Sequence, residues 1–157
     1  MDFSRITEDL YIGDTPSRKD YKQLHDLGVC LVINMRLERP PAPDMLKPPI
    51  KFVWLPTIDS PGLVIPICFL RYGARAALNC ITKGGKVYAH CQRGRHRGVA
   101  MGAAILIAQG VDAEQAMRLI KERRPDADPD IFYIRSRILR FEKSYKKARR
   151  VKENLFQ

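Results

Sequence analysis

Apolar and polar positions along the chain divide it into short apolar runs and longer stretches with helical spacing. Short apolar runs are typical of strands, and a continuous run such as Val29–Asn34 is typical of a strand that is covered on both faces. Such runs predict strands at Leu10–Ile12, Val29–Asn34, Lys51–Leu55 and Lys86–His90.

The stretches between these runs carry apolar residues three and four positions apart, which predicts helices. Glycine or proline follows several of them, at Gly28, Gly110 and Pro125, where a helix would end. The predicted helices cover residues 17–27, 66–82, 97–109, 113–124 and 130 to about 154, and the proline-rich segment 36–49 and the segment 57–64 are predicted loops. Strands that alternate with helices predict an α/β fold with a central, mostly parallel sheet flanked by helices.

The length of the chain and its apolar segments limit the number of domains and the kind of protein that we expect. A chain of 157 residues fits one domain, and we expect a single domain over residues 1–157. The longest strongly apolar stretch, Val99–Ala108, is well short of the ~20 residues that a membrane-spanning helix needs. The first residues contain no apolar signal core. We therefore expect a cytoplasmic protein without a membrane span.

The four cysteines differ in their surroundings. Cys30, Cys68 and Cys80 lie between apolar neighbours and are predicted to be small core residues. No C-x-x-C pair is present, so neither a disulfide framework nor a zinc site is expected. Cys91 stands apart, because charged residues follow it closely.

The net charge of +11 is concentrated in the second half of the chain. Residues 86–157 contain 17 basic and 8 acidic side chains, and residues 135–157 alone contain nine basic and two acidic ones. A basic half suggests anionic partners such as phosphates. For the tail, a solvated basic helix face is an equally good interpretation.

Cys91 lies where a predicted strand ends and a predicted helix begins. Ligands of open α/β sheets bind beyond the carboxyl ends of strands, and a helix N-terminus offers free N–H groups to an anion. Gly94 lets the backbone curl so that several N–H groups face one point. Arg97 lies six positions after Cys91, so its planar guanidinium can reach the same point and donate hydrogen bonds to phosphate oxygens. These cations and the helix N-terminus favour the thiolate form of Cys91, the form that attacks phosphorus.

The segment His90-Cys91-Gln92-Arg93-Gly94-Arg95-His96-Arg97 resembles the H-C-x5-R signature of the protein tyrosine phosphatase superfamily. The wider chain is similar to its compact dual-specificity branch over about residues 5–145, with a basic helical tail to 157. The resemblance implies a phosphatase without a metal cofactor that works through a phosphocysteine on Cys91. It implies that Arg97 and the loop residues Gln92, Arg93, Gly94, Arg95 and His96 bind phosphate, and that His90 has a supporting, structural role.

A general acid is needed to protonate the leaving group, and in the family it is an aspartate on an upstream loop. Asp59 follows a predicted strand that should end on the same side of the sheet as Cys91. It is the only acidic residue between Asp44 and Cys91. The alternative is that Asp59 only forms a turn before Ser60-Pro61-Gly62. Asp126, Asp128 and Asp130 form a second acidic segment, which either braces the phosphate loop or caps the last helix.

Two features depart from the family pattern. Gly98 replaces the serine or threonine whose hydroxyl helps the thiolate leave, so the second chemical step is expected to be slow. Arg93, Arg95 and His96 make the loop unusually basic, which suits a substrate with several phosphates. The core Gly94-Arg95-His96-Arg97 resembles the loop of atypical phosphatases that act on inositol pyrophosphates, and a basic residue at Arg95 also occurs in phosphoinositide phosphatases.

The leading hypothesis is a dual-specificity protein phosphatase acting on phosphotyrosine, phosphoserine or phosphothreonine. An alternative substrate is an inositol polyphosphate, an inositol pyrophosphate or a phosphoinositide. A rhodanese does not need Asp59, and an arsenate-reductase-like enzyme carries its loop near the N-terminus. A third hypothesis is an inactive anion- or RNA-binding module of the same fold, which has no use for a nucleophile. We expect a monomer that does not bind nucleic acid.

Overall fold

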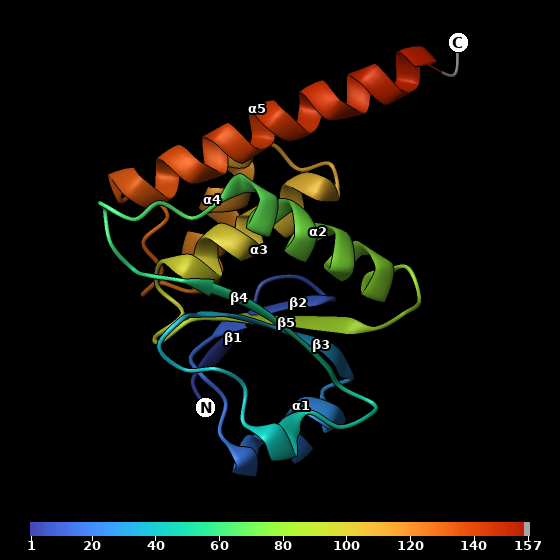
Figure 1. Cartoon of the computed structure of the whole chain (residues 1–157), viewed down its shortest axis with the longest axis vertical. Helices are drawn as coiled ribbons and strands as arrows, with labels where there is room; N and C mark the ends of the chain where they lie inside the picture. The colour runs from blue at the N-terminus through green and yellow to red at the C-terminus, as the bar shows by residue number, and fades with distance from the viewer. Residues whose placement is uncertain (156–157) are drawn as a thin grey trace.

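The computed structural model describes residues 1–155 and contains one five-stranded sheet with helices on both faces (Figure 1). The elements are β1 (Phe3–Arg5), β2 (Leu10–Gly13), η1 (Arg18–Asp20), α1 (Tyr21–Asp26), β3 (Val29–Arg36), η2 (Pro43–Met45), β4 (Lys51–Thr57), α2 (Ile67–Ile81), β5 (Lys86–His90), α3 (Arg97–Ala108), α4 (Ala113–Arg123) and α5 (Phe132–Leu155). The strand order is β1-β2-β5-β3-β4, and every pair is parallel except β1 with β2. The predicted α/β fold with a mostly parallel sheet is confirmed.

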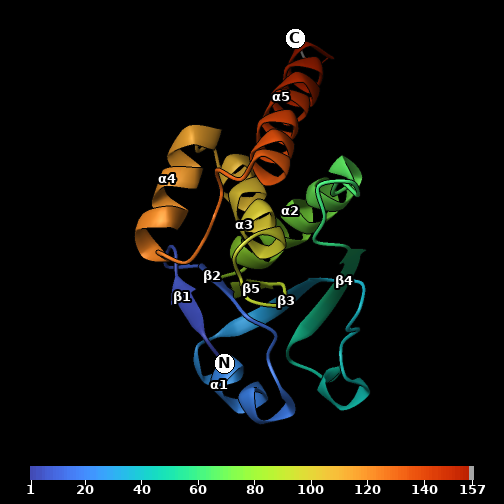
Figure 2. The same cartoon turned by 90° about the vertical axis from the view of Figure 1, so that its left-hand side faces the viewer.

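The two faces of the sheet are covered unequally. Helices α2 to α5 lie on one face and α1 lies on the other, as two perpendicular views show (Figures 1 and 2). Helix α3 is the central helix, and its residues from Arg97 to Ile107 are all buried because strands and helices surround it. A helix that is apolar on all sides in sequence is therefore buried on all sides in the fold.

The sheet brings the ends of its strands to one edge. In the parallel register Asn34 lies opposite His90, and Arg36 lies opposite Thr57. The segments that follow β5, β3 and β4 consequently start side by side. Residues far apart in sequence converge at this edge of the sheet, where ligands of such folds bind.

Several predicted boundaries were wrong by a few residues. Strands β3 and β4 continue to Arg36 and Thr57, because the two strands remain paired beyond the ends of the predicted apolar runs. Residues 17–27 divide into η1 and α1, because Asp20 accepts hydrogen bonds from the backbone and hydroxyl of Ser17 (both 2.7 Å) and tightens the first turn. The last helix begins at Phe132 instead of Asp130.

Strand β1 was not predicted, because three residues carry no readable period. It is held at the sheet edge by antiparallel pairing with β2 and by Phe3, whose ring centroid lies 5.7 Å from that of Tyr11.

The cysteine prediction was only partly right. Cys30, in β3, and Cys80, in α2, are half-buried, whereas Cys68 is exposed near the start of α2. Within residues 1–155, none of the helices is both long enough and apolar enough to cross a bilayer.

Candidate active site

The loop from Cys91 to His96 connects the end of β5 to the start of α3. Cys91 is 2% exposed, so its sulfur lies at the bottom of the loop. Gly94 has φ +63°, and a Cβ there would lie 2.6 Å from the carbonyl oxygen of Gly13. Only glycine allows both this backbone conformation and this approach to β2, which explains why the loop carries glycine at this position.

Four carbonyl groups of the loop accept hydrogen bonds from residues distant in sequence. The Thr15 hydroxyl donates to the Cys91 carbonyl (3.0 Å), and the Asp128 N–H donates to the Arg95 carbonyl (2.9 Å). Arg124 donates to the carbonyls of both Arg93 and Gly94 (2.9 Å each). Within residues 1–155, none of the backbone N–H groups of residues 92–96 donates to another protein group. The loop therefore presents free donors, as an anion site requires.

Arg124 is a buried residue that sequence reasoning missed. Besides the two loop carbonyls, its guanidinium donates to a carboxylate oxygen of Asp2 (2.8 Å) and to the Ser4 hydroxyl (3.3 Å). One alternative for the acidic segment was that an aspartate side chain braces the loop. Within residues 1–155 the loop is held instead by Arg124 and by the backbone of residues 126 and 128. The Asp130 carboxylate instead accepts from Arg135 (2.9 Å).

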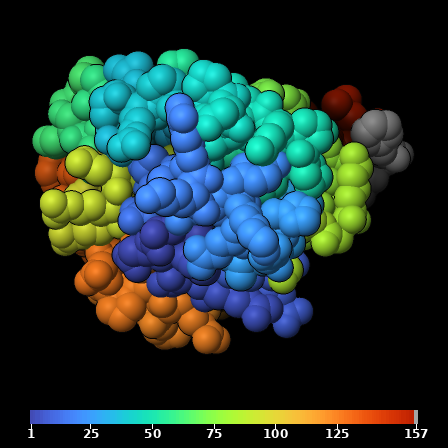
Figure 3. All heavy atoms as spheres, turned by 90° about the horizontal axis from the view of Figure 1, so that it is seen from below, coloured from blue at the N-terminus to red at the C-terminus, as the bar shows by residue number. Residues whose placement is uncertain are grey.

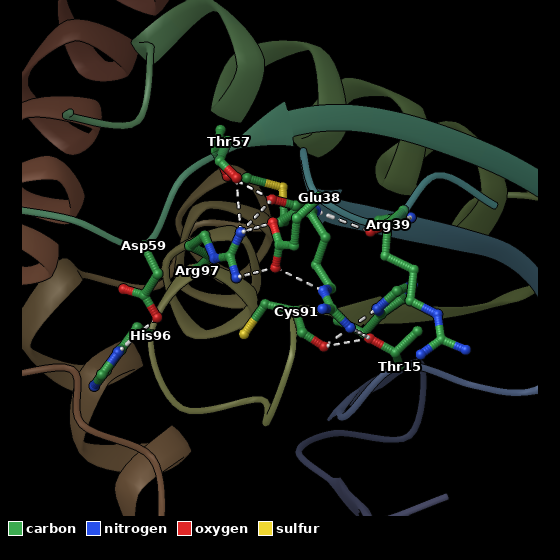
Figure 4. Close-up of polar contacts among 12 residues, drawn as sticks. Thr15, Glu38, Arg39, Thr57, Asp59, Cys91, His96 and Arg97 are labelled. Atoms are coloured by element: carbon green, nitrogen blue, oxygen red, sulfur yellow. Dashed lines mark hydrogen bonds and ion pairs between the residues drawn. The ribbon is translucent and has the colours of Figure 1, made fainter.

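The Arg97 side chain is buried and lies beside Cys91 (Figure 4). Its Nη1 donates to the carbonyl oxygens of Thr57 (2.7 Å) and Met35 (3.3 Å), and both terminal nitrogens donate to Glu38 (3.0 and 3.1 Å). Its Nε is the only buried side-chain nitrogen or oxygen without a hydrogen-bond partner among residues 1–155. Nε–H and the second hydrogen of Nη2 thus remain free for a ligand.

Glu38 is a second residue that the sequence did not reveal. It follows β3 and bonds both Arg97 and Arg36, the latter at 2.8 Å. Hydrogen bonds from Arg97 lower the pKa of Glu38 to about 2, although burial opposes this shift. Burial acts to lower the pKa of Arg97, but the bond to Glu38 and the nearby Cys91 outweigh it and raise the pKa. Charged residues follow many strands, so nothing in the sequence pattern distinguished Glu38 as a residue of the site.

Asp59 lies opposite Cys91 and is held from two sides (Figure 4). One carboxylate oxygen lies 2.9 Å from Nδ1 of His96, and the other accepts from the Tyr133 hydroxyl at 2.7 Å. Tyr133, in the first turn of α5, was also missed by sequence reasoning. Burial, followed by the bond to Asp59, raises the pKa of Tyr133 to about 12, so this hydroxyl remains a donor at neutral pH.

A cavity of about 250 Å³ opens above the loop. Its lining residues come from the loop and from the predicted acid, and they are Asp59, Cys91, Gln92, Arg93, Arg95 and His96. Arg93 and Arg95 are exposed at its rim, and Nε of Arg95 donates to the Asp126 carbonyl (3.1 Å). The structure thus places Asp59 and Cys91, the predicted acid and nucleophile, in the lining of one cavity.

His90, the last residue of β5, and Gly98, in the first turn of α3, flank this loop. Burial lowers the pKa of His90 to about 3, so its imidazole is neutral, and Nδ1 lies 3.4 Å from the Cys91 carbonyl oxygen. A Cβ at Gly98 would lie 3.3 Å from the Cys91 nitrogen, a close but not prohibitive contact. Within residues 1–155, histidine, cysteine and carboxylate side chains form no group of three or more that could hold a metal ion.

Comparison with known proteins agrees with this geometry. The family profile "Dual specificity phosphatase, catalytic domain" matches residues 10–144. Dual specificity phosphatase 28 of Mus musculus is 25% identical over 82% of this chain and 77% of its own length. Tyrosine-protein phosphatase yvh1 of Schizosaccharomyces pombe is 27% identical over 92% of this chain, which spans 43% of that protein.

Solved structures show the same fold. The crystal structure of PTPMT1 has a TM-score of 0.84 at 26% identity and covers 96% of this chain and 99% of its own. The crystal structure of human DUSP28 has a TM-score of 0.81 at 23% identity and covers 92% of this chain and 95% of its own. On the profile match, the fold and these relatives, the chain belongs to the dual-specificity phosphatase family and is a phosphatase of the dual-specificity type.

Proposed function

We propose that the chain hydrolyses phosphomonoesters through a phosphocysteine on Cys91. The observation that carries this proposal is the pair of free donors on Arg97, Nε–H and Nη2–H, beside the free N–H groups of residues 92–96. A planar fork of two N–H groups matches two oxygens of a phosphoryl group. Glu38 occupies the other edge of the guanidinium and so fixes the direction in which the fork points.

The first step transfers the phosphoryl group to sulfur. The thiolate of Cys91 attacks phosphorus, the bond from phosphorus to the ester oxygen breaks, and that oxygen takes a proton from Asp59. Arg97 and the loop N–H groups stabilise the charge on the three equatorial oxygens. Asp59 must be protonated for this step, and its position between His96 and Tyr133 keeps the carboxyl aimed at the cavity.

The second step releases phosphate. Asp59, now ionised, takes a proton from a water molecule whose oxygen attacks phosphorus, and the phosphorus–sulfur bond breaks to return the thiolate of Cys91. Helix α3 begins at Arg97, so its N-terminus helps to stabilise the departing thiolate. Gly98 offers no hydroxyl to assist, which supports the prediction that this step is slow.

For the substrate we propose a phosphorylated protein, on tyrosine, serine or threonine, in keeping with the names of the relatives. The second candidate is a phosphorylated inositol or a phosphoinositide. It is favoured by Arg93 and Arg95 at the cavity rim and by the structure of PTPMT1 in complex with PI(5)P, which has a TM-score of 0.83 at 25% identity. We propose the cytoplasm as the site of action, since a reducing compartment keeps Cys91 reduced.

The experiment is phosphate release from a panel of substrates by the wild-type chain and by Cys91→Ser. The panel holds p-nitrophenyl phosphate, phosphotyrosine and phosphothreonine peptides, a phosphoinositide and a soluble inositol polyphosphate. We expect release by the wild type and none above background by Cys91→Ser. Equal rates for the two proteins would remove the proposed role of Cys91. The substrate with the highest kcat/KM then decides between the two classes.

A further inference from the structure

A second cavity, of about 550 Å³, lies on the α1 face of the sheet. Its walls are the segment that follows β2, the segment that follows β3 and the end of β5, and they include Thr15, Lys19, Asn34, Arg39 and His90. It shares no lining residue with the cavity above Cys91. Figure 3 shows this face, where the blue segment around residues 15–30 lies beside the cyan segment around residues 40–50. In Figure 4, Arg39 and Asp59 lie on opposite sides of Cys91.

The charges around this second cavity have one sign. Three cations line it, Arg18, Lys19 and Arg39, and no acidic side chain does. Arg18 pairs with Asp44 outside the lining (3.0 Å), whereas the side chains of Lys19 and Arg39 form no ion pair or hydrogen bond with residues 1–155. The Asn34 amide donates to the Arg39 carbonyl (2.8 Å) and fixes the segment that carries this arginine. Two uncompensated cations therefore border one concave space, which attracts an anion.

The floor of the cavity offers a buried polar group. His90 is 2% exposed and neutral, because burial lowers its pKa to about 3. Its Nδ1 lies 3.4 Å from the Cys91 carbonyl oxygen, and its Nε2 forms no hydrogen bond with any group in residues 1–155. Because Nε of Arg97 is the only fully buried side-chain nitrogen or oxygen without a partner in these residues, the His90 Nε2 is accessible, and His90 lines this cavity. With the proton on Nδ1, Nε2 is an acceptor and suits a hydroxyl group of a ligand. Phe52, Met45 and three prolines supply apolar walls against which a small ring can pack.

We propose that this cavity binds a small organic phosphate that carries hydroxyl groups, with its phosphate at Lys19 and Arg39 and a hydroxyl at His90. Its volume falls within the ~300–1,000 Å³ that is usual for small-molecule sites. The site is separate from the catalytic cavity, and the proposal does not depend on the reaction assigned to Cys91.

The occupant would lie against two residues that hold the catalytic loop. The Thr15 hydroxyl donates to the Cys91 carbonyl (3.0 Å) and accepts from Arg36 (2.8 Å). His90 is the residue directly before the nucleophile. Binding in this cavity is therefore coupled to the position of the Cys91 backbone through Thr15 and His90.

The test is an amide NMR titration of the full chain carrying Cys91→Ser, which prevents turnover of the probe. Ribose 5-phosphate is the main probe, and inorganic phosphate, which lacks the hydroxyl groups, is the comparison. We expect saturable shifts in residues 15–19 and 39–45 with ribose 5-phosphate, and binding at least about tenfold weaker with inorganic phosphate. Shifts in residues 91–97 report binding at the catalytic loop separately.

Two double variants complete the test. Lys19→Ala/Arg39→Ala should weaken ribose 5-phosphate binding at residues 15–19 and 39–45 by at least about tenfold. Lys147→Ala/Lys152→Ala removes the same charge from the exposed far end of α5 and should leave it unchanged. Shifts confined to residues 91–97, or an equal loss in both variants, would overturn the proposed site. Equal affinity for the two probes would overturn the hydroxyl contact at His90.

Discussion

Asp59 shows how one residue depends on its neighbours for a chemical role. His96 and Tyr133 each hold one oxygen of its carboxylate, so the side chain cannot turn to solvent without losing two hydrogen bonds. The alternative that Asp59 only forms a turn leaves these two bonds unexplained. The turn is formed instead by Ser60, whose hydroxyl accepts from the Gly62 N–H (3.2 Å).

Replacing Asp59 with asparagine tests this role. Asp59→Asn should lower kcat/KM, which reports transfer of the phosphoryl group to Cys91, by about 10²–10⁴ on an alkyl phosphate, because a poor leaving group needs the proton. The loss should be much smaller on p-nitrophenyl phosphate, whose leaving group departs without one. The measurement is kcat/KM on both substrates, since kcat reports the slow second step, which is the same for both. Equal, small losses on the two would show that Asp59 is not the acid.

Gly98 provides a second prediction at this scale. A hydroxyl that bonds the departing thiolate is worth about 1.5–3 kcal/mol, so Gly98→Ser should speed hydrolysis of the phosphocysteine by about tenfold or more. Gly98→Ala adds the same Cβ, 3.3 Å from the Cys91 nitrogen, without the hydroxyl. The readout is the steady-state rate after the first turnover of p-nitrophenyl phosphate. A similar rise in both variants would attribute the effect to backbone geometry. No rise in Gly98→Ser would show that the missing hydroxyl does not slow hydrolysis of the phosphocysteine.

At the scale of elements, the Cys91–His96 loop is held by parts of the chain that lie far from it in sequence. Arg124, just after α4, joins the loop carbonyls to the N-terminal residues Asp2 and Ser4. Tyr133 joins α5 to the Asp59 loop. The helices beyond the sheet thus position the site as well as cover the core.

Arg124→Met tests this connection. The change removes donors to two loop carbonyls, and buried acceptors without partners cost about 1–3 kcal/mol each. We expect unfolding free energy to fall by several kcal/mol and KM for p-nitrophenyl phosphate to rise. Arg123→Met, at the exposed neighbouring position, is the matched control and should change neither quantity much. Identical behaviour of the two variants would contradict the bracing role.

The sequence predicted the elements that carry the site more accurately than the contacts that complete it. A buried strand, a glycine and an apolar helix around Cys91 are local patterns, and the parallel register then brings Asp59 to the same edge. Glu38, Arg124 and Tyr133 contact the site only through tertiary packing, so no spacing or period identified them. The three-residue β1 was missed for the same reason, since pairing with β2 makes it a strand.

For the molecule as a whole, stability should depend on pH through His90. Burial holds its folded pKa at about 3, below the ordinary value of 6.5. Between these values the unfolded chain binds a proton that the folded chain does not, so stability falls as the pH falls below 6.5. From pH 6.5 to 5 this loss is about 2 kcal/mol at most. This window lies above the range in which carboxylates such as Glu38 titrate.

Urea denaturation at pH 6.5 and pH 5 measures this contribution. His90→Asn should lose less stability than the wild type across this interval, even if it is less stable at both pH values. His25→Asn, which replaces an exposed histidine, should retain the wild-type difference. The same pH dependence in all three proteins would show that His90 does not carry it.

The account as a whole depends on a covalent bond between Cys91 and phosphorus. The most direct measurement is rapid quenching of the wild-type chain with p-nitrophenyl phosphate, followed by mass spectrometry of the intact protein and its peptides. A slow second step predicts a phosphoryl group on the peptide that contains Cys91, at close to one per chain, and none in Cys91→Ser. Continued hydrolysis by the wild type with no phosphoryl group on that peptide at any time would contradict the account.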